Sequence, residues 1–121
     1  MPKILVVDDE VNVRKLYQKE LEDEGHEVVT AATGPEALRR IAESTPDLVI
    51  LDIKLETENG LDVLRRMKEI QPTLAVILNS GYSTYRDDFS SWLADAYLVK
   101  CSNTAELTST VREVLEARAV R

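Results

Sequence analysis

Short and almost continuous apolar runs recur along this chain, and segments with helical spacing separate them. The clearest runs occupy residues 4–7, 48–51, 75–78 and 97–99, and a weaker run occupies residues 27–30. A strand whose residues are nearly all apolar is buried on both faces, as in a parallel sheet that helices cover on both sides. The alternation therefore predicts an α/β fold with a doubly wound, five-stranded parallel sheet and right-handed crossovers.

The segments between the runs carry apolar residues at the three- and four-residue spacing of one helix face. Each such segment predicts a helix that packs on the sheet. The positions with this spacing are Val13, Leu16, Tyr17 and Leu21, then Ala37, Leu38 and Ile41, then Leu61, Leu64 and Met67, and last Leu107, Val111, Val114 and Leu115.

Several polar residues and one glycine predict where these helices begin and end. Gly25 follows the first helical segment, where glycine commonly ends a helix. Thr33 with Glu36, and Asn103 with Glu106, have the spacing of N-terminal capping pairs.

Residues 81–97 form the least regular segment of the chain. Tyr85, Phe89 and Trp92 have helical spacing, but charged and hydroxyl side chains crowd the pattern and no C-terminal glycine follows. We expect a short, weak helix here. His26, the one histidine, lies in the turn before residues 27–30 and is expected at the plain surface.

Composition limits the class of protein. The chain has 121 residues, and we expect a single domain over residues 1–121 without a second domain. Hydrophobic residues make up 44% and charged residues 31%, which is typical of a globular protein rather than a disordered one. A single cysteine, Cys101, excludes an internal disulfide framework and fits the reducing cytoplasm.

Charge and hydropathy also limit the partners. The N-terminal apolar run is only four residues long and acids follow it at once, so we expect neither a signal peptide nor a membrane span. Fifteen Lys and Arg stand against 22 Asp and Glu, which gives a net charge of −7. That charge disfavours direct binding to nucleic acid or anionic lipid. We expect a cation or a protein as the partner.

Polar side chains follow four of the expected strands at the point where each strand ends. In an open parallel sheet, ligands bind beyond the carboxyl ends of the strands. We therefore expect three carboxylates, a hydroxyl and an ammonium group to meet at one edge of the sheet. In chain order the residues in these positions are Asp8, Asp9, Asp52, Asn79, Ser80 and Lys100.

The chemistry of this set predicts a metal and a nucleophile. Neighbouring carboxylates repel one another, and a bound cation relieves the repulsion. Oxygen ligands without His or Cys select a hard ion, and a few carboxylates completed by water and phosphate suit Mg²⁺. Asp8 and Asp9 belong together as metal ligands, which leaves Asp52 to attack phosphorus and form an aspartyl phosphate.

Each of these residues also has a plainer interpretation. Asp8 or Asp9 alone would cap the following helix, Asp52 or Ser80 would belong to a turn, and Lys100 would be a solvated charge. We favour the joint interpretation because all of them fall at the ends of the correct strands.

Four motifs in order along the whole chain resemble the receiver domain of two-component response regulators. They are "ILVVDDE" at the start, "PDLVILDIKLETENGLDVL" around Asp52, "SGY" from Ser80 and "DAYLVK" ending in Lys100. The resemblance implies a flavodoxin-like sheet with strand order 2-1-3-4-5. It also implies a switch that accepts a phosphoryl group from a sensor histidine kinase or phosphotransfer domain and acts on a downstream protein or output domain.

The same resemblance implies a role for each motif residue. Asp52 would be the phosphoacceptor, and Asp8 and Asp9 would hold Mg²⁺ together with Asp52. The backbone carbonyl of Lys54 would complete the protein ligands.

Three further residues would respond to phosphorylation. Ser80 and Lys100 would contact its oxygens, and Tyr97 matches the aromatic residue that changes rotamer when the domain switches. The change would alter the surface around the weak helix in residues 81–97, the last strand and the last helix.

Some positions depart from the family pattern. Cys101 stands where family members usually carry proline after the lysine, Glu56 where proline is common, and Leu93 where glycine is common. Residues 80–97 also form a shorter segment than usual. These departures concern the output face and leave the phosphorylation motif complete.

Three other functions compete with the switch. A degenerate receiver would bind partners without phosphate, but the full acid set argues against it. A Mg²⁺-dependent phosphatase or nuclease would need a general acid after Asp52 and a cap domain, which the sequence lacks. A flavin-binding protein would need a hydroxyl- and glycine-rich loop after the first strand, where the chain instead has acids.

Overall fold

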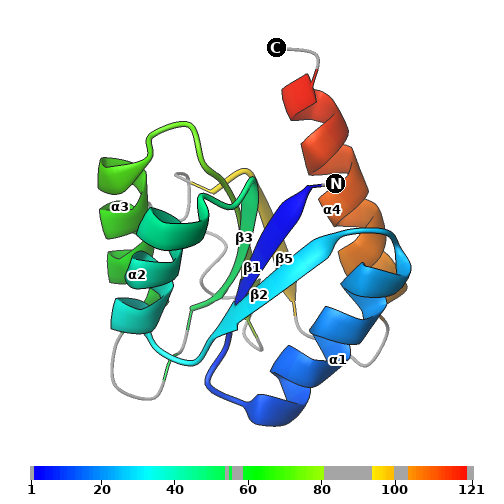
Figure 1. Ribbon diagram of the computed structural model, residues 1–121, viewed down its shortest axis with the longest axis horizontal. Coiled ribbons are helices and arrows are strands. Elements are labelled where there is room, and N and C mark those ends of the chain that lie inside the picture. Colours follow the sequence, from blue (N-terminus) through cyan, green and yellow to red (C-terminus); the bar gives the residue numbers. More distant parts are fainter. Residues whose placement is uncertain (1, 54, 56–58, 81–93, 100–103, 120–121) are drawn as a thin grey trace.

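A five-stranded parallel sheet forms the centre of the fold (Figure 1). The computed structural model describes residues 2–53, 55, 59–80, 94–99 and 104–119. In chain order the strands are β1 (Lys3–Val7), β2 (Glu27–Ala31), β3 (Leu48–Asp52), β4 (Ala75–Ser80) and β5 (Ala96–Val99).

The order of the strands is β2-β1-β3-β4-β5, and all four neighbouring pairs are parallel. This confirms the doubly wound sheet and the 2-1-3-4-5 order. Each expected strand is present, with bounds one or two residues wider than its apolar run. β3 and β4 extend beyond their runs because the polar residues that follow, such as Asp52 and Ser80, still pair with their neighbours.

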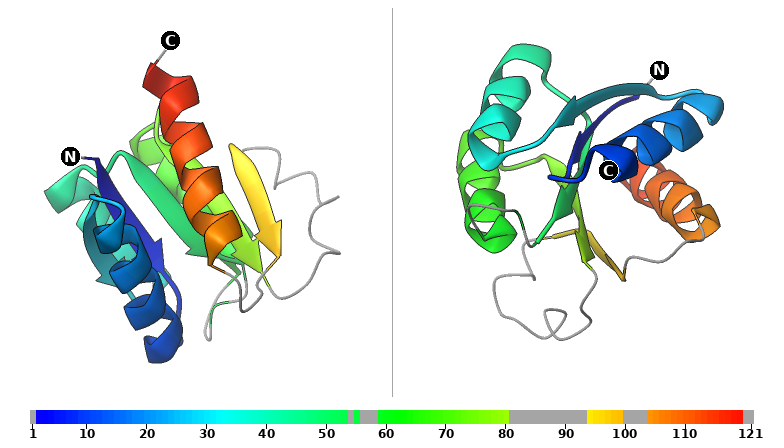
Figure 2. Two further views of the ribbon diagram at one scale, coloured as in Figure 1. Left: turned by 90° about the vertical axis from the view of Figure 1, so that its right-hand side faces the viewer. Right: turned by 90° about the horizontal axis from the view of Figure 1, so that it is seen from below.

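Helices cover both faces of the sheet (Figures 1 and 2). Among the described residues none of these helices combines the length and apolar character that crossing a bilayer requires. The weak helix expected within residues 81–97 lies outside the described residues. On one face lie α2 (Gly34–Ser44) and α3 (Gly60–Ile70), and on the other lie α1 (Val11–Asp23) and α4 (Ala105–Ala119).

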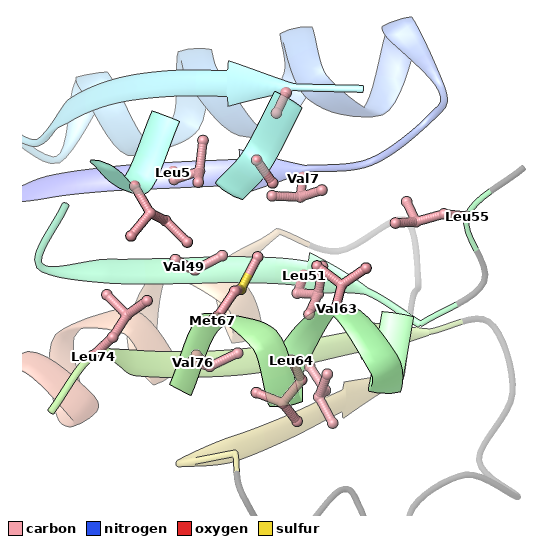
Figure 3. Close-up of a cluster of buried hydrophobic side chains, with 14 of the residues drawn as sticks. Leu5, Val7, Val49, Leu51, Leu55, Val63, Leu64, Met67, Leu74 and Val76 are labelled. Carbon is pink, nitrogen blue, oxygen red and sulfur yellow. The ribbon is translucent and has the colours of Figure 1, made fainter. Parts of the chain in front are cut away.

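Alternate residues of each strand fill two separate hydrophobic clusters. On β1, Leu5 and Val7 belong to the cluster under α2 and α3, whereas Ile4 and Val6 belong to the cluster under α1 and α4. Figure 3 shows the first cluster, in which Met67 and its neighbours from α3 pack on the sheet. Burial on both faces is the reason that the strands are nearly continuous apolar runs.

The end of α1 agrees with the sequence prediction. Gly25 has a φ of 91°, a backbone conformation that side chains with a Cβ rarely adopt. Its N–H donates to the carbonyl of Glu22 at 3.0 Å, and the N–H of His26 donates to the carbonyl of Leu21 at 3.1 Å. These bonds satisfy the last carbonyls of the helix.

The start of α2 also agrees with the prediction, with one change in the capping bonds. The hydroxyl of Thr33 accepts from the N–H of Glu36 at 3.3 Å. The carboxylate of Glu36 accepts from the N–H of Ala32 at 2.7 Å rather than from that of Thr33. The other expected cap, Asn103, lies outside the described residues.

Two side chains differ from their expected environments. Leu16 belongs to the apolar pattern of α1, yet 43% of it is exposed, because Tyr17 and Leu21 define the buried face of that helix. His26 was expected at the plain surface, but it is half-buried and its Nδ1 makes no hydrogen bond among the described residues. Burial lowers the pKa of His26, and this outweighs the opposing effect of the Glu24 carboxylate.

Candidate functional site

Three consecutive acids follow β1 at the carboxyl edge of the sheet, which is the lower edge in Figure 1. Asp8 is buried, Asp9 is half-buried and Glu10 is exposed. One carboxylate oxygen from each lies within 4.8 Å of the others. The right-hand view of Figure 2 looks onto this edge of the sheet.

Backbone contacts hold the acidic turn in place. The N–H of Asp8 donates to the carbonyl of Ala31 at 3.1 Å, which ties the turn to β2. Oδ1 of Asp8 accepts from the N–H of Glu10 at 2.9 Å, and the guanidinium of Arg14 donates to the carbonyl of Asp8 at 2.7 Å. Glu10 occupies the N-cap position of α1 but makes no side-chain capping bond. The N-cap position therefore belongs to Glu10 rather than to Asp8 or Asp9, the residues to which the plainer interpretation gives the cap.

Asp52 is the last residue of the central strand β3, and only 4% of it is exposed. Val7 and Leu51 are partners across β1 and β3, so Asp8 and Asp52 each lie one residue beyond the same pair. Asp52 is thus part of a strand rather than of a turn, and it lies level with the acids that follow β1.

A glycine brings the start of α3 against the backbone that follows Asp52. The N–H of Gly60 donates to the carbonyl of Ile53 at 2.5 Å. A Cβ at position 60 would lie 2.6 Å from Cα of Ile53 and 2.8 Å from its carbonyl oxygen, and closer still to the carbonyl oxygen of Asp52. The absence of a side chain at Gly60 therefore permits this contact. The sequence predicted the helix but not this approach.

A buried polar contact joins α1 to the end of β4. Asn79 is 3% exposed and Tyr17 is 6% exposed. The side-chain amide Nδ2 of Asn79 donates to the hydroxyl of Tyr17 at 2.8 Å. The position of Asn79 directly after the apolar residues 75–78 is the one sign in the sequence that a polar contact occurs here.

The structure describes the remaining predicted site residues to different extents. Ser80 is the last residue of β4, where its backbone pairs with Val99. Tyr97 lies in β5, half-buried, and packs against the cluster under α2 and α3. Lys54 and Lys100 lie outside the described residues, as does Cys101. The backbone of the described part thus brings the ends of β1, β3 and β4 to one edge, as the sequence predicted.

The donor set at this edge consists of oxygen atoms. Among the described residues, the compact acidic group comprises Asp8, Asp9 and Glu10, and Asp52 ends the neighbouring strand outside that group. The sequence prediction chose only Asp8 and Asp9 from this run. Carboxylate oxygens without nitrogen or sulfur ligands favour a hard divalent ion.

Comparison with known proteins identifies the family of this chain. The model of the response regulator receiver domain family matches residues 4–112. The chain belongs to this family. Receiver domains of two-component response regulators are signalling modules. The matched range includes the acidic group and all five described strands apart from Lys3, the first residue of β1.

Individual relatives agree with the family match. The receiver domain is 34% identical over 117 residues to the response regulator ArlR of Staphylococcus saprophyticus, which covers 95% of this chain and 53% of ArlR. The chain thus spans about half the length of that relative.

Solved structures share the fold at higher identity. The response regulator TrrA of Thermotoga maritima, in complex with Mg(2+)-BeF, is 45% identical with a TM-score of 0.90, and the match covers 94% of this chain and 99% of TrrA. TrrA in complex with the histidine kinase ThkA gives 45% identity and a TM-score of 0.88, over 95% of this chain and 99% of TrrA.

Proposed function

We propose that this receiver domain accepts a phosphoryl group on Asp52 from a sensor histidine kinase, or from a phosphotransfer domain, in the cytoplasm. The observation that carries the proposal is the buried carboxylate of Asp52 at the end of the central strand, level with the acids that follow β1. The complexes of TrrA with Mg(2+)-BeF and with ThkA support it.

The proposed reaction is a direct displacement at phosphorus. A carboxylate oxygen of Asp52 attacks the phosphorus of a phosphohistidine, a P–O bond forms and the P–N bond breaks. The imidazole nitrogen leaves with the electron pair and takes a proton from water. Because the entering and leaving atoms must lie in line with phosphorus, the position of Asp52 determines the rate.

The donor set fits a resident Mg²⁺. The carboxylates of Asp8, Asp9 and Asp52 and the backbone carbonyl of Lys54 would hold the ion, and Glu10 adds a third acid to the compact group. When bound, Mg²⁺ neutralises negative charge on the phosphoryl oxygens. The buried Asp8 and half-buried Asp9 would bind from the same turn that the guanidinium of Arg14 holds.

We expect the conformational change of the proposed switch to occur at Ser80 in β4 and Tyr97 in β5. Phosphorylation adds nearly two negative charges and new acceptor oxygens beside Asp52. The Ser80 hydroxyl and the Lys100 ammonium are the proposed donors to those oxygens. Movement of Ser80 would make room for Tyr97 to change rotamer, and so alter the surface that a downstream protein or output domain recognises.

Intact-mass measurement tests the proposal. Incubation of the wild type with acetyl phosphate and Mg²⁺ is expected to add the mass of one phosphoryl group, and Asp52→Asn is expected to gain none. Omission of Mg²⁺ is expected to slow the gain. Ser80→Ala is expected to gain the phosphoryl group but to show smaller chemical-shift changes at Tyr97. No gain by the wild type would favour a degenerate receiver that binds its partners without phosphate.

A further inference from the structure

The contact between Tyr17 and Asn79 connects parts of the receiver domain that are far apart in the sequence. The two residues are separated by 62 positions, both side chains are buried, and the amide-to-hydroxyl distance is 2.8 Å. A buried amide that loses such a bond lowers the stability of the fold, because no water replaces the lost partner. Each side chain therefore holds the other in place.

The backbone of Asn79 connects this contact to the phosphoacceptor strand. Asn79 is the partner of Asp52 across β4 and β3. Its carbonyl accepts from the N–H of Ile53 at 3.4 Å, and the carbonyl of Ile53 in turn accepts from Gly60. A continuous series of hydrogen bonds thus leads from Tyr17 on α1 across β4 and β3 to the first residue of α3. The residue after Asp52 takes part in two of them.

The placement of Asn79 beside Asp52 makes this series relevant to the chemistry. Residues in register on neighbouring parallel strands direct their side chains to the same face of the sheet. Asn79 and Asp52 are such a pair, and both end their apolar runs. A shift of Asn79 would therefore displace Asp52 directly, because the two residues are partners on neighbouring strands.

We propose that Tyr17 and Asn79 are positioning residues for Asp52: their hydrogen bond fixes the carboxyl end of β4, and through it the end of β3, in the arrangement that phosphoryl acceptance requires. This inference rests on the proposed function. In this role both residues act through the backbone that carries Asp52, without contacting the phosphoryl group.

A purely structural role makes a different prediction from a positioning role. Removal of one partner leaves the other buried without its bond and destabilises the fold, whereas replacement of both by apolar groups of similar shape is nearly neutral. Tyr17→Phe combined with Asn79→Leu is such a replacement. It restores an apolar contact in the core but does not restore the bond that fixes the end of β4.

The experiment compares wild type, Tyr17→Phe, Asn79→Leu, the double variant and Leu21→Val. Leu21 is a fully buried residue of the same helix and belongs to the same cluster as Tyr17, so it supplies a control for loss of stability alone. For each protein, urea unfolding gives the midpoint. Intact mass against time, at saturating Mg²⁺ and increasing acetyl phosphate, gives the maximum rate and the half-saturating donor concentration.

The single variants are expected to unfold at lower urea concentration, and the double variant to recover most of the midpoint. Its maximum rate is nevertheless expected to stay about tenfold below that of the wild type, with little change in the half-saturating concentration, because the nucleophile is misplaced. Leu21→Val is expected to keep the wild-type rate.

Two results would overturn the inference while leaving the proposed function in place. One is a double variant that phosphorylates as fast as the wild type. The other is a rate that falls equally in Leu21→Val and in Tyr17→Phe. Because Tyr17→Phe removes only a hydroxyl group, this comparison can be made even if the double variant does not fold. A wild type that gains no phosphoryl group, like Asp52→Asn, would instead reject the proposed function and this inference with it.

Discussion

Replacement of Gly60 by alanine introduces a methyl group into the backbone that follows Asp52. The new Cβ would lie 2.6 Å from Cα of Ile53 and 2.8 Å from its carbonyl oxygen, where ordinary contacts begin near 3.4 Å. Its neighbours are main-chain atoms at the end of β3 and cannot rotate away as a side chain would. Either α3 or the end of β3 must therefore move, by about 1 Å to reach normal contact distances.

The size of the effect follows from that displacement. Overpacking of this kind costs about 1–3 kcal/mol of folding free energy, a large part of the roughly 5–15 kcal/mol that stabilises a typical domain. A misplacement of about 1 Å can also lower a reaction rate by about a hundredfold. We expect Gly60→Ala to fold with a lower urea midpoint and to accept phosphoryl from acetyl phosphate at least about tenfold more slowly than the wild type.

Gly25→Ala is the matched control. Gly25 has a φ of 91°, and a Cβ on this residue would meet nothing within 4 Å, so alanine there strains the backbone without a clash. That strain costs about 1–2 kcal/mol, and it lies after α1, in the turn before β2. The rate of phosphorylation, followed by intact mass, is expected to be normal in Gly25→Ala. Equal slowing in both variants, or a wild-type rate in Gly60→Ala, would refute the reasoning.

Three further outcomes are expected. Thr33→Ala should lower the free energy of unfolding by about 1 kcal/mol in urea titrations, because α2 loses its N-cap bond. Folding lowers the pKa of His26 from its ordinary value of 6.5, so the unfolded chain binds the proton more readily. The free energy of unfolding should therefore be highest above pH 6.5 and fall below it. Urea unfolding of His26→Gln should show less of this loss. Asp9→Asn should bind Mg²⁺ more weakly than the wild type in a calorimetric titration, and equal binding would contradict the proposed metal site.

The sheet could be predicted because strands that are buried on both faces appear in the sequence as continuous apolar runs. Residues such as Ile4 and Leu5 face different clusters, so both must be apolar and the run becomes continuous. The end of α1 was equally readable, since the positive φ at Gly25 favours a residue without a side chain. The approach of acids at the carboxyl edge followed from parallel topology, which places the ends of neighbouring strands side by side.

Other features could not be predicted, because they depend on distances between elements. Helical spacing places Tyr17 on the buried face of α1, but it does not say which strand the hydroxyl reaches. The clash that excludes a side chain at Gly60 depends on how closely α3 approaches β3. His26 is half-buried through packing that its own neighbours in sequence do not specify. Each of these needs the packed structure.

Trapping of the acyl phosphate tests the central claim most directly. Borohydride reduces an aspartyl phosphate to homoserine, and peptide mass spectrometry then locates the changed residue. After incubation with acetyl phosphate and Mg²⁺, homoserine is expected at position 52 in the wild type and at no position in Asp52→Asn. Homoserine at Asp8 or Asp9 instead, or none at position 52 in a protein that has gained phosphoryl mass, would contradict the assignment of Asp52 as the phosphoacceptor.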